Sequence, residues 1–289
     1  MGGVGVRIER LSEINRYHEC ESLQERVWGL DGIDVVPLHL MITMQKSGGL
    51  ILGAFDETDR MVGFLLGFLG ARDGNVRRPK HCSHMMGVLE EWRGRGVGYR
   101  LKLAQREHAL SQGLDLVTWT YDPLESLNAA LNIGKLGAVC GTYVRDLYGP
   151  MTDGLNAGLS TDRFCVDWWI DSDRVRTRLS GDRPRPSLAA VLDRGAVLLN
   201  PATVGSDGLP RPAPALERSR ASIVLIEIPA NVRAIKAADM GLARRWRERT
   251  REAFEERFAV GYTVSDFLSE EEGGVGRSWY VLERGCEGV

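Results

Sequence analysis

Hydrophobic and polar positions follow two periods along the first half of the chain. Alternation at every second residue and short apolar runs predict strands, whereas recurrence at three to four residues predicts helices. The predicted strands cover residues 4–8, 49–55, 61–70, 82–89, 114–121, 138–147 and 163–170. The predicted helices cover residues 12–28, 99–112 and 126–136, and another begins at Pro37. This order favours an α/β fold, a mixed sheet with helices on both faces.

The pattern changes after residue 170. Residues 171–220 hold six of the 11 prolines of the chain, and they predict a linker-like wrap with one short strand at residues 196–200. Beyond it, a strand is predicted at residues 222–228, a helix at 237–258 and two strands at 260–267 and 278–283. We therefore expect a first domain over residues 1–171, the wrap over 172–220 and a C-terminal α+β extension over 221–289. The extension repeats the order strand, helix, strand, strand and is a candidate degenerate half-repeat.

Composition and charge limit the classes of partner and the location that the sequence predicts. The net charge of -2 gives no general reason to bind nucleic acid. The arginines of residues 244–251 are interleaved with Glu248, Glu252, Glu255 and Glu256 over an apolar seam, which predicts a solvated outer face. Five cysteines without a CxxC pair argue against a zinc site, so no metal is expected. The start of the chain lacks the apolar core of a signal peptide, and no apolar run is long enough for a membrane span. We expect a cytoplasmic protein with a small-molecule partner and leave a homodimer open.

A glycine-rich elbow, RGRGVG at residues 93–98, joins a predicted strand to a predicted helix. A helix that begins at such an elbow presents unpaired N–H groups and its positive dipole end, which favours an anion. The spacing fits neither the Walker loop nor the GxGxxG dinucleotide fingerprint. It matches RxxGxG, with Arg93, Gly96 and Gly98.

With this elbow in the run VLEEWRGRGVGYRLKLAQ, and with this element order, the chain resembles the GCN5-related N-acetyltransferase (GNAT) superfamily. The resemblance implies a mostly antiparallel sheet with a central splay and an elbow that holds the pyrophosphate of coenzyme A. The stretches SHMMGVL, WTYDPLESLNAALNIGKLGA, YGPMTDGLN and TDRFCVDW resemble a bacterial branch with a longer C-terminal part, associated with N-acylamino acid racemases. That likeness implies acetyl-CoA or succinyl-CoA as donor and a small amino acid as acceptor.

Carried over by position, the resemblance assigns a set of cofactor-binding residues around the elbow. The set comprises Gly87, Val88, Leu89, Arg93, Gly94, Arg95, Gly96, Val97 and Gly98. Val88 lies where strand backbone pairs with the pantetheine arm, and the absence of a side chain at Gly87 would let the thioester come close. Val88 and Thr118 are expected on the two sides of the splay.

Catalysis requires a base, because only the neutral amine can attack a thioester. Four residues separate His84 from Val88 on one predicted strand, so alternation places both on the same face and makes His84 the leading base, with a packed core histidine as the alternative. Glu90 is a second candidate, although adjacent acids before a helix are also dipole partners. Ile133 occupies the position where many superfamily members carry a tyrosine that protonates the leaving thiolate. Asn132, Tyr143 or Tyr148 would then substitute, or the thiolate leaves unaided.

Two further groups are candidates for ligand contacts. Asn128, Asn132 and Lys135 share one face of the predicted helix, where Asn128 and Lys135 would contact the cofactor; a solvated Lys135 at the helix end is the alternative. Asp162 and Arg163 would hold the amino and carboxylate ends of an amino acid, or form an internal ion pair that fixes the loop. The sequence therefore favours a CoA-dependent N-acyltransferase, with a non-catalytic acyl-CoA sensor or scaffold as the alternative.

Overall fold

The computed structural model describes residues 5–29, 34–149, 158–181 and 186–285. The described chain forms two compact units, the first ending at Trp119 and the second beginning at Thr120. The division lies inside a strand, because packing groups the end of that strand with later elements. The predicted domain boundaries at residues 171 and 220 stay predictions.

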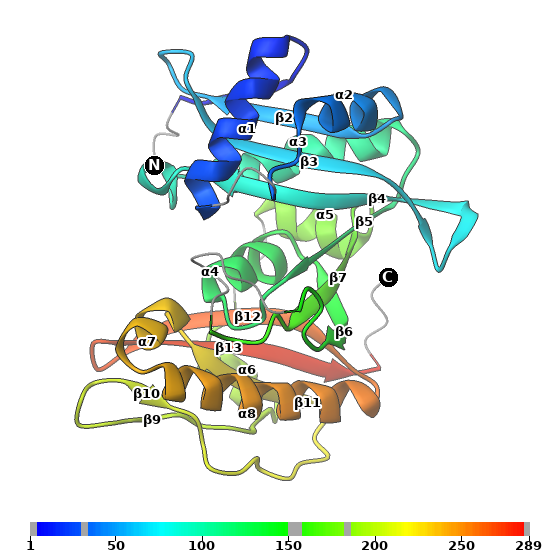
Figure 1. Ribbon diagram of the computed structural model, residues 1–289. Helices are drawn as coiled ribbons and strands as arrows, with labels where there is room; N and C mark the ends of the chain where they lie inside the picture. The colour runs from blue at the N-terminus through cyan, green and yellow to red at the C-terminus, as the bar shows by residue number, and fades with distance from the viewer. Residues whose placement is uncertain (1–4, 30–33, 150–157, 182–185, 286–289) are drawn as a thin grey trace. The chain divides into compact units, whose positions relative to one another are not determined.

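The first unit is built on a sheet with the strand order β1-β2-β3-β4-β5. Its elements are β1 (Arg7–Arg10), α1 (Ile14–Trp28), α2 (Leu38–Lys46), β2 (Leu50–Phe55), β3 (Met61–Arg72), β4 (Asn75–Val88), η1 (Glu90–Trp92), α3 (Val97–Ser111) and β5 (Leu116–Tyr121), whose first four residues belong to this unit. All neighbours pair antiparallel except β4 and β5, which are parallel. Helices α1 and α2 cover one face and α3 the other (Figure 1). The predicted α/β fold, with a mixed and mostly antiparallel sheet, is confirmed.

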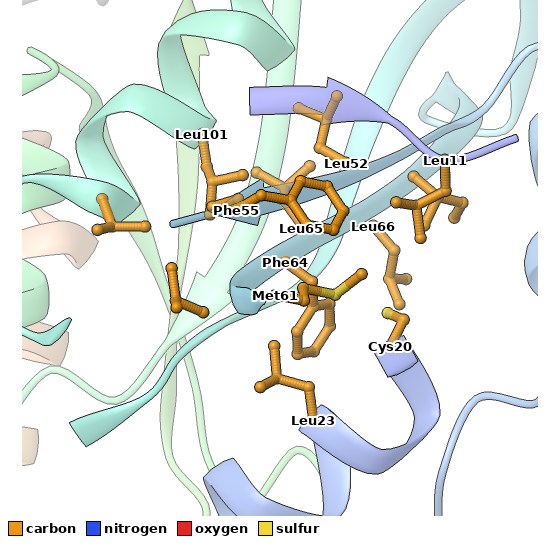
Figure 2. Close-up of a cluster of buried hydrophobic side chains, with 14 of the residues drawn as sticks. Leu11, Cys20, Leu23, Leu52, Phe55, Met61, Phe64, Leu65, Leu66 and Leu101 are labelled. Carbon is orange, nitrogen blue, oxygen red and sulfur yellow. The ribbon is translucent and has the colours of Figure 1, made fainter. Parts of the chain in front are cut away.

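The core of this unit lies between the sheet and its helices. Strands β2 and β3 are continuous apolar runs because helices cover both of their faces, and every residue of β2 is buried. Figure 2 shows the side chains that meet there from the loop before α1, from α1, β2, β3 and α3. The labelled residues are Leu11, Cys20, Leu23, Leu52, Phe55, Met61, Phe64, Leu65, Leu66 and Leu101.

Strand β4 begins seven residues earlier than the sequence predicted. Residues 75–80 are mostly polar and exposed, yet they pair with the end of β3 through a turn at Asp73 and Gly74, both at positive φ. Backbone hydrogen bonds form this part of the hairpin without an apolar face. Periodicity reports burial, so it gave no signal here.

Two irregularities of β4 shape the middle of the sheet. Leu66 pairs with Met85 and Gly67 with Ser83, so His84 is the additional residue of a β-bulge. On its other side, β4 pairs with β5 only at His81–Val117 and Cys82–Thr118. Among the described residues, residues 83–88 do not pair with β5, so the two strands part after Cys82. We call this opening the fork.

The second unit carries the sheet order β7-β6-β12-β13-β11-β8. Its elements are α4 (Ser126–Ala129), η2 (Ala130–Lys135), β6 (Val139–Val144), β7 (Arg163–Trp169), α5 (Asp173–Ser180), α6 (Leu188–Asp193), β8 (Val197–Leu198), β9 (Thr203–Val204), β10 (Pro210–Arg211), β11 (Ile223–Pro229), α7 (Val232–Ala238), α8 (Met240–Ala259), β12 (Tyr262–Glu272) and β13 (Val275–Arg284). The region predicted as a wrap therefore contains two short helices, each with a serine N-cap. The long C-terminal helix is divided at Asp239, which caps α8.

Two antiparallel hairpins, β6–β7 and β12–β13, meet through their first strands in this unit. Cys140 pairs with Val264, and each of the two residues directly precedes an irregularity in its own hairpin. A helix precedes each hairpin in the chain, η2 before the first and α8 before the second. The degenerate half-repeat stays a prediction, and this pair of helix–hairpin units is the segment to which it applies.

Candidate functional site

The elbow forms an open cradle of backbone N–H groups between β4 and α3. Gly94 and Gly96 adopt φ of 74° and 81°, in the left-handed region that disfavours other residues, and a Cβ added at either would meet nothing within 4 Å. The first hydrogen bond of α3 runs from Arg100 N to Gly96 O. The N–H groups of residues 97–99 therefore have no partner within the helix and remain available to an anion.

The two arginines of the elbow make different contacts: Arg93 bonds to the backbone, and Arg95 packs on an aromatic ring. Arg93 Nε donates to Val88 O at 3.2 Å, which ties the elbow to the end of β4. The guanidinium of Arg95 lies 5.2 Å from the centre of the Trp92 ring, and Trp92 packs against the core of the first unit. Arg95 is thus held on the elbow by an aromatic face while its charge stays near the cradle.

The strand end that leads into the elbow is placed as predicted, but Gly87 has another reason to be glycine. A Cβ there would meet Phe64 Cε1 at 2.8 Å and Trp28 Cη2 at 3.2 Å. Gly87 therefore permits close packing against β3 and α1, and space for a thioester is not what requires it. Val88 faces α3 with Val97, and buried Leu89 donates its N–H to Val62 O.

The fork supplies the predicted central splay, with one correction. Val88 lies beyond the last pair of the β4–β5 ladder, as expected, whereas Thr118 is itself the last paired residue of β5. The first residues beyond the ladder are Ser83 on β4 and Trp119 on β5. The opening therefore begins one residue after Thr118.

His84 lies on the face opposite to that predicted. Its ring contacts Phe68 with centroids 6.0 Å apart. Phe68 alternates with Gly67, which faces Gln105 of α3, so Phe68 and His84 are on the α1–α2 face while Val88 faces α3. The bulge at His84 adds one residue between them and breaks the period of two. Part of the side-chain surface stays exposed, and the burial of the rest lowers the pKa of His84 below its usual value.

Glu90 starts the short helix η1 and its side chain is exposed. Its carbonyl accepts the N–H of Arg93 at 3.1 Å, and neighbouring Glu91 pairs with Arg60 at 2.6 Å. These contacts stabilise the turn before the elbow. No contact of the Glu90 carboxylate among the described residues points to catalysis, so its role as a base stays a prediction.

Lys102 of α3 is a functional candidate that the sequence did not indicate. It is only 2% exposed, and its Nζ lies 2.8 Å from Ser83 Oγ, 3.1 Å from Gln105 Oε1 and 3.6 Å from the centre of the Trp119 ring. Burial lowers the pKa of Lys102 well below its usual value. A lysine within a helical pattern looks solvated in a sequence, and the fork that buries this one forms through long-range pairing.

The three residues expected on one helical face of the second unit do not share one. Asn132 is buried, whereas Asn128 and Lys135 are exposed. The segment is one α-helical turn followed by the π-helix η2, whose wider turn breaks the spacing of three and four. Ile133 is fully buried. The predicted contacts of Asn128 and Lys135 with the cofactor stay predictions.

Tyr143 and Asp162 belong to a buried network of the second unit. Tyr143 Oη donates to Asp162 Oδ2 at 2.5 Å, and Arg251 Nε donates to the same oxygen at 2.7 Å. Burial, with some help from Asp162, raises the pKa of Tyr143, which makes it a poor proton donor to a thiolate. Burial alone would raise the pKa of Asp162, but the donors from Arg251 and Tyr143 outweigh it and lower that pKa.

This network corrects two predictions. Asp162 is fully buried and forms an ion pair with Arg251. The predicted alternative, an internal ion pair, therefore applies in place of a contact with an amino-acid substrate, and its cation is Arg251 rather than Arg163. Arg163 is 7% exposed, donates to Asp162 O at 3.0 Å and lies 5.3 Å from the centre of the Tyr148 ring. Tyr143 is likewise occupied within the protein.

Helix α8 is not a purely solvated arginine surface. Arg247 is 2% exposed and pairs with Asp122 at 2.5 Å, while Arg251 reaches Asp162. Although burial opposes it, the charge of Asp122 raises the pKa of Arg247. The interleaved glutamates predicted a solvated outer face, whereas these two arginines pair with aspartates far away in the chain.

Other site types lack support in the described residues. No group of three or more His, Cys, Asp or Glu side chains there is arranged to hold a metal ion. None of the described helices is both long and apolar enough to cross a bilayer.

Comparisons with known proteins give matches in structure only. No protein-family model matches the chain, and no curated protein sequence does. Among solved structures, the ribosomal-protein-S18-alanine N-acetyltransferase from Escherichia coli is 14% identical, with 58% of this chain and 96% of that chain covered and a TM-score of 0.45. A GNAT-family acetyltransferase from Streptococcus pneumoniae is 18% identical, with 56% and 98% covered and a TM-score of 0.45.

Proposed function

We propose that the protein is an acyl-CoA-dependent N-acyltransferase that moves an acetyl or succinyl group to the amine of a small acceptor. The acceptor that we propose is an amino acid. The observation that carries the proposal is the adjacency of two features in the first unit. The fork between β4 and β5 offers unpaired strand backbone to an extended arm, and the elbow at the end of the same strand offers N–H groups to a pyrophosphate. An extended molecule with a phosphate handle fits both.

The chemistry needs little more than alignment and a base. The amine nitrogen attacks the thioester carbonyl carbon, the C–S bond breaks, and the amine loses a proton. His84 is the base that the geometry favours, because it lies at the bulge where the fork opens and is exposed. Its lowered pKa keeps the imidazole neutral, and so able to accept a proton, at neutral pH.

One observation favours the alternative function, a non-catalytic acyl-CoA sensor or scaffold. Ile133 is buried and apolar, and the hydroxyl of Tyr143 is committed to Asp162. Neither residue can protonate a leaving thiolate. Release of free CoA thiol from acetyl-CoA or succinyl-CoA with a panel of D- and L-amino acids would separate the two functions, because a sensor binds the donor without turnover.

Binding is tested at the cradle. Gly96→Asp places a negative charge and a strained side chain at the N-terminus of α3, where an anion would lie. We expect acetyl-CoA or succinyl-CoA to raise the Tm of the wild type and to leave the variant unshifted. Gly113→Asp is the control, because Gly113 also has positive φ but lies at the other end of α3. A wild type that no acyl-CoA stabilises would refute the proposal.

His84 is tested through pH. Because the pKa of His84 is lowered, kcat/KM should rise as pH increases through a value below about 6.5 and then stay level. His84→Ala should lower kcat/KM about 100-fold and remove that rise. His39→Ala, at an exposed histidine of α2, is the matched control. An unchanged pH profile in His84→Ala would exclude it as the base.

A further inference from the structure

The buried amine of Lys102 occupies the point where the β4–β5 ladder opens. The last parallel pair is Cys82–Thr118, so the next pair would be Ser83 with Trp119. Lys102 Nζ contacts both of these residues instead, at 2.8 Å from Ser83 Oγ and 3.6 Å from the centre of the Trp119 ring. The amine therefore lies at the inner end of the fork, on the side of α3.

No carboxylate contacts this amine in the part of the chain that the structure describes. Its neighbours are a hydroxyl, the amide oxygen of Gln105 and an indole face. The other titratable groups near it are His81 of β4 and His108 of α3, whose rings lie 6.0 Å apart, and β3 contributes Gly67 at this place. Burial, with smaller effects from His108 and Lys102, lowers the pKa of His81 to about 3, so it is neutral at neutral pH.

Burial lowers the pKa of Lys102 well below its usual value, but these three contacts act in the opposite direction because they suit an ammonium rather than a neutral amine. Two oxygens accept N–H bonds from Nζ, and an aromatic face attracts a cation but repels a lone pair. A cation buried without an anion is costly, and an apolar side chain of similar volume would usually be as stable or more so. Fold stability therefore does not explain Lys102, whereas an anion that forms in the fork during a reaction does.

The length of β4 brings a thioester sulfur near this cation. From Val88 at the elbow to Ser83, five residues of strand span roughly 16 Å. A pantetheine arm has about thirteen bonds between phosphorus and sulfur, which reach about 15 Å at the rise per bond of an extended chain. An arm that starts at the elbow and follows β4 therefore ends near Ser83.

We propose that Lys102 is a fixed cation that stabilises the thiolate leaving group at the inner end of the fork. The inference rests on the proposed acyl-CoA function and accounts for the lack of an acid at Ile133. When the C–S bond breaks, the sulfur leaves with the electron pair as a thiolate, and the proton lost by the amine goes to His84. Lys102 keeps its proton, so it acts through charge and position.

The test compares CoA with desulfo-CoA, which lacks the thiol, in the complete protein. If Lys102 lowers the pKa of the bound thiol by about one unit from its usual ~8.5, CoA should gain about threefold in affinity over desulfo-CoA between pH ~6 and pH ~8. Calorimetry at both pH values gives the two dissociation constants. In Lys102→Met the ratio of affinities should not change with pH, because no cation favours the thiolate.

Controls separate charge from structure. Lys46→Met makes the same change at an exposed lysine of α2 and should keep the wild-type ratio at each pH. Lys102→Met should unfold at the same temperature as the wild type or a higher one. A variant that loses stability and binds both ligands equally less well would show a structural role and overturn the inference.

A second measurement does not depend on any variant. An NMR titration of wild-type protein with CoA carrying ¹³C next to the sulfur reports the pKa of the bound thiol directly. A value below that of free CoA supports the inference, and an equal or higher value overturns it. If CoA and desulfo-CoA both bind with a constant ratio, only this inference fails; if neither binds, the proposed function fails as well.

Discussion

Both units of the protein bury a basic side chain, but they surround it differently. In the second unit, Arg247 is 2% exposed and pairs with Asp122 at 2.5 Å. In the first unit, Lys102 is equally buried and has only neutral neighbours among the described residues. A buried charge with a counter-ion is explained by the fold that encloses it. One without a counter-ion suggests an anion that arrives with a ligand.

The strongest test of this difference removes the counter-ion of Arg247. Asp122→Asn keeps the side-chain oxygen that accepts the N–H of Leu124 but removes the charge. It leaves a guanidinium buried and unpaired, so we expect a loss of about 3 kcal/mol in the free energy of unfolding. Urea denaturation measures it.

Two further variants sharpen the comparison. Asp173→Asn removes the charge from an exposed pair with Arg176 and should cost far less than Asp122→Asn. Lys102→Met should leave the free energy of unfolding within about 1 kcal/mol of the wild type or raise it. If Lys102→Met costs as much as Asp122→Asn, the two cations are equivalent and Lys102 is structural.

Acid should lower the free energy of unfolding, because His81 is buried near Lys102 and cannot easily take up a proton in the folded state. His81 is fully buried with its folded pKa lowered to about 3, whereas an unfolded histidine titrates near ~6.5. The unfolded state therefore binds the extra proton, and stability falls as pH drops below about 6.5, by about 2 kcal/mol at pH ~5. His81→Leu should remove this part of the acid sensitivity in urea denaturation at a series of pH values. His39→Leu, at an exposed histidine, is the control, and equal slopes in the two variants would contradict the prediction.

A small effect is also expected at the paired network of the second unit. Tyr143→Phe removes one donor from Asp162, which keeps the two bonds from Arg251 and the N–H of Asp146. We expect a loss of about 1 kcal/mol in the free energy of unfolding and no change in the pH dependence of kcat. A loss of the alkaline side of the kcat profile would restore Tyr143 as an acid.

The sequence by itself determined the features that depend on neighbours in the chain. The apolar runs of β2 and β3, the turn between them and the order of elements follow from local periodicity. The elbow is local too, because positive φ at Gly94 and Gly96 and the start of α3 need only those residues and the helix formers after them.

Only the tertiary structure decided the face of His84, the burial of Lys102 and Arg247 and the partner of Asp162. A bulge adds one residue to β4 and reverses the faces that alternation assigns, so residue counting fails across it. The charged residues are buried by contacts between distant segments, such as Arg247 with Asp122. Local sequence patterns contain no such distances, because a charged side chain looks the same along a helix whether its partner is water, an aspartate or an indole ring.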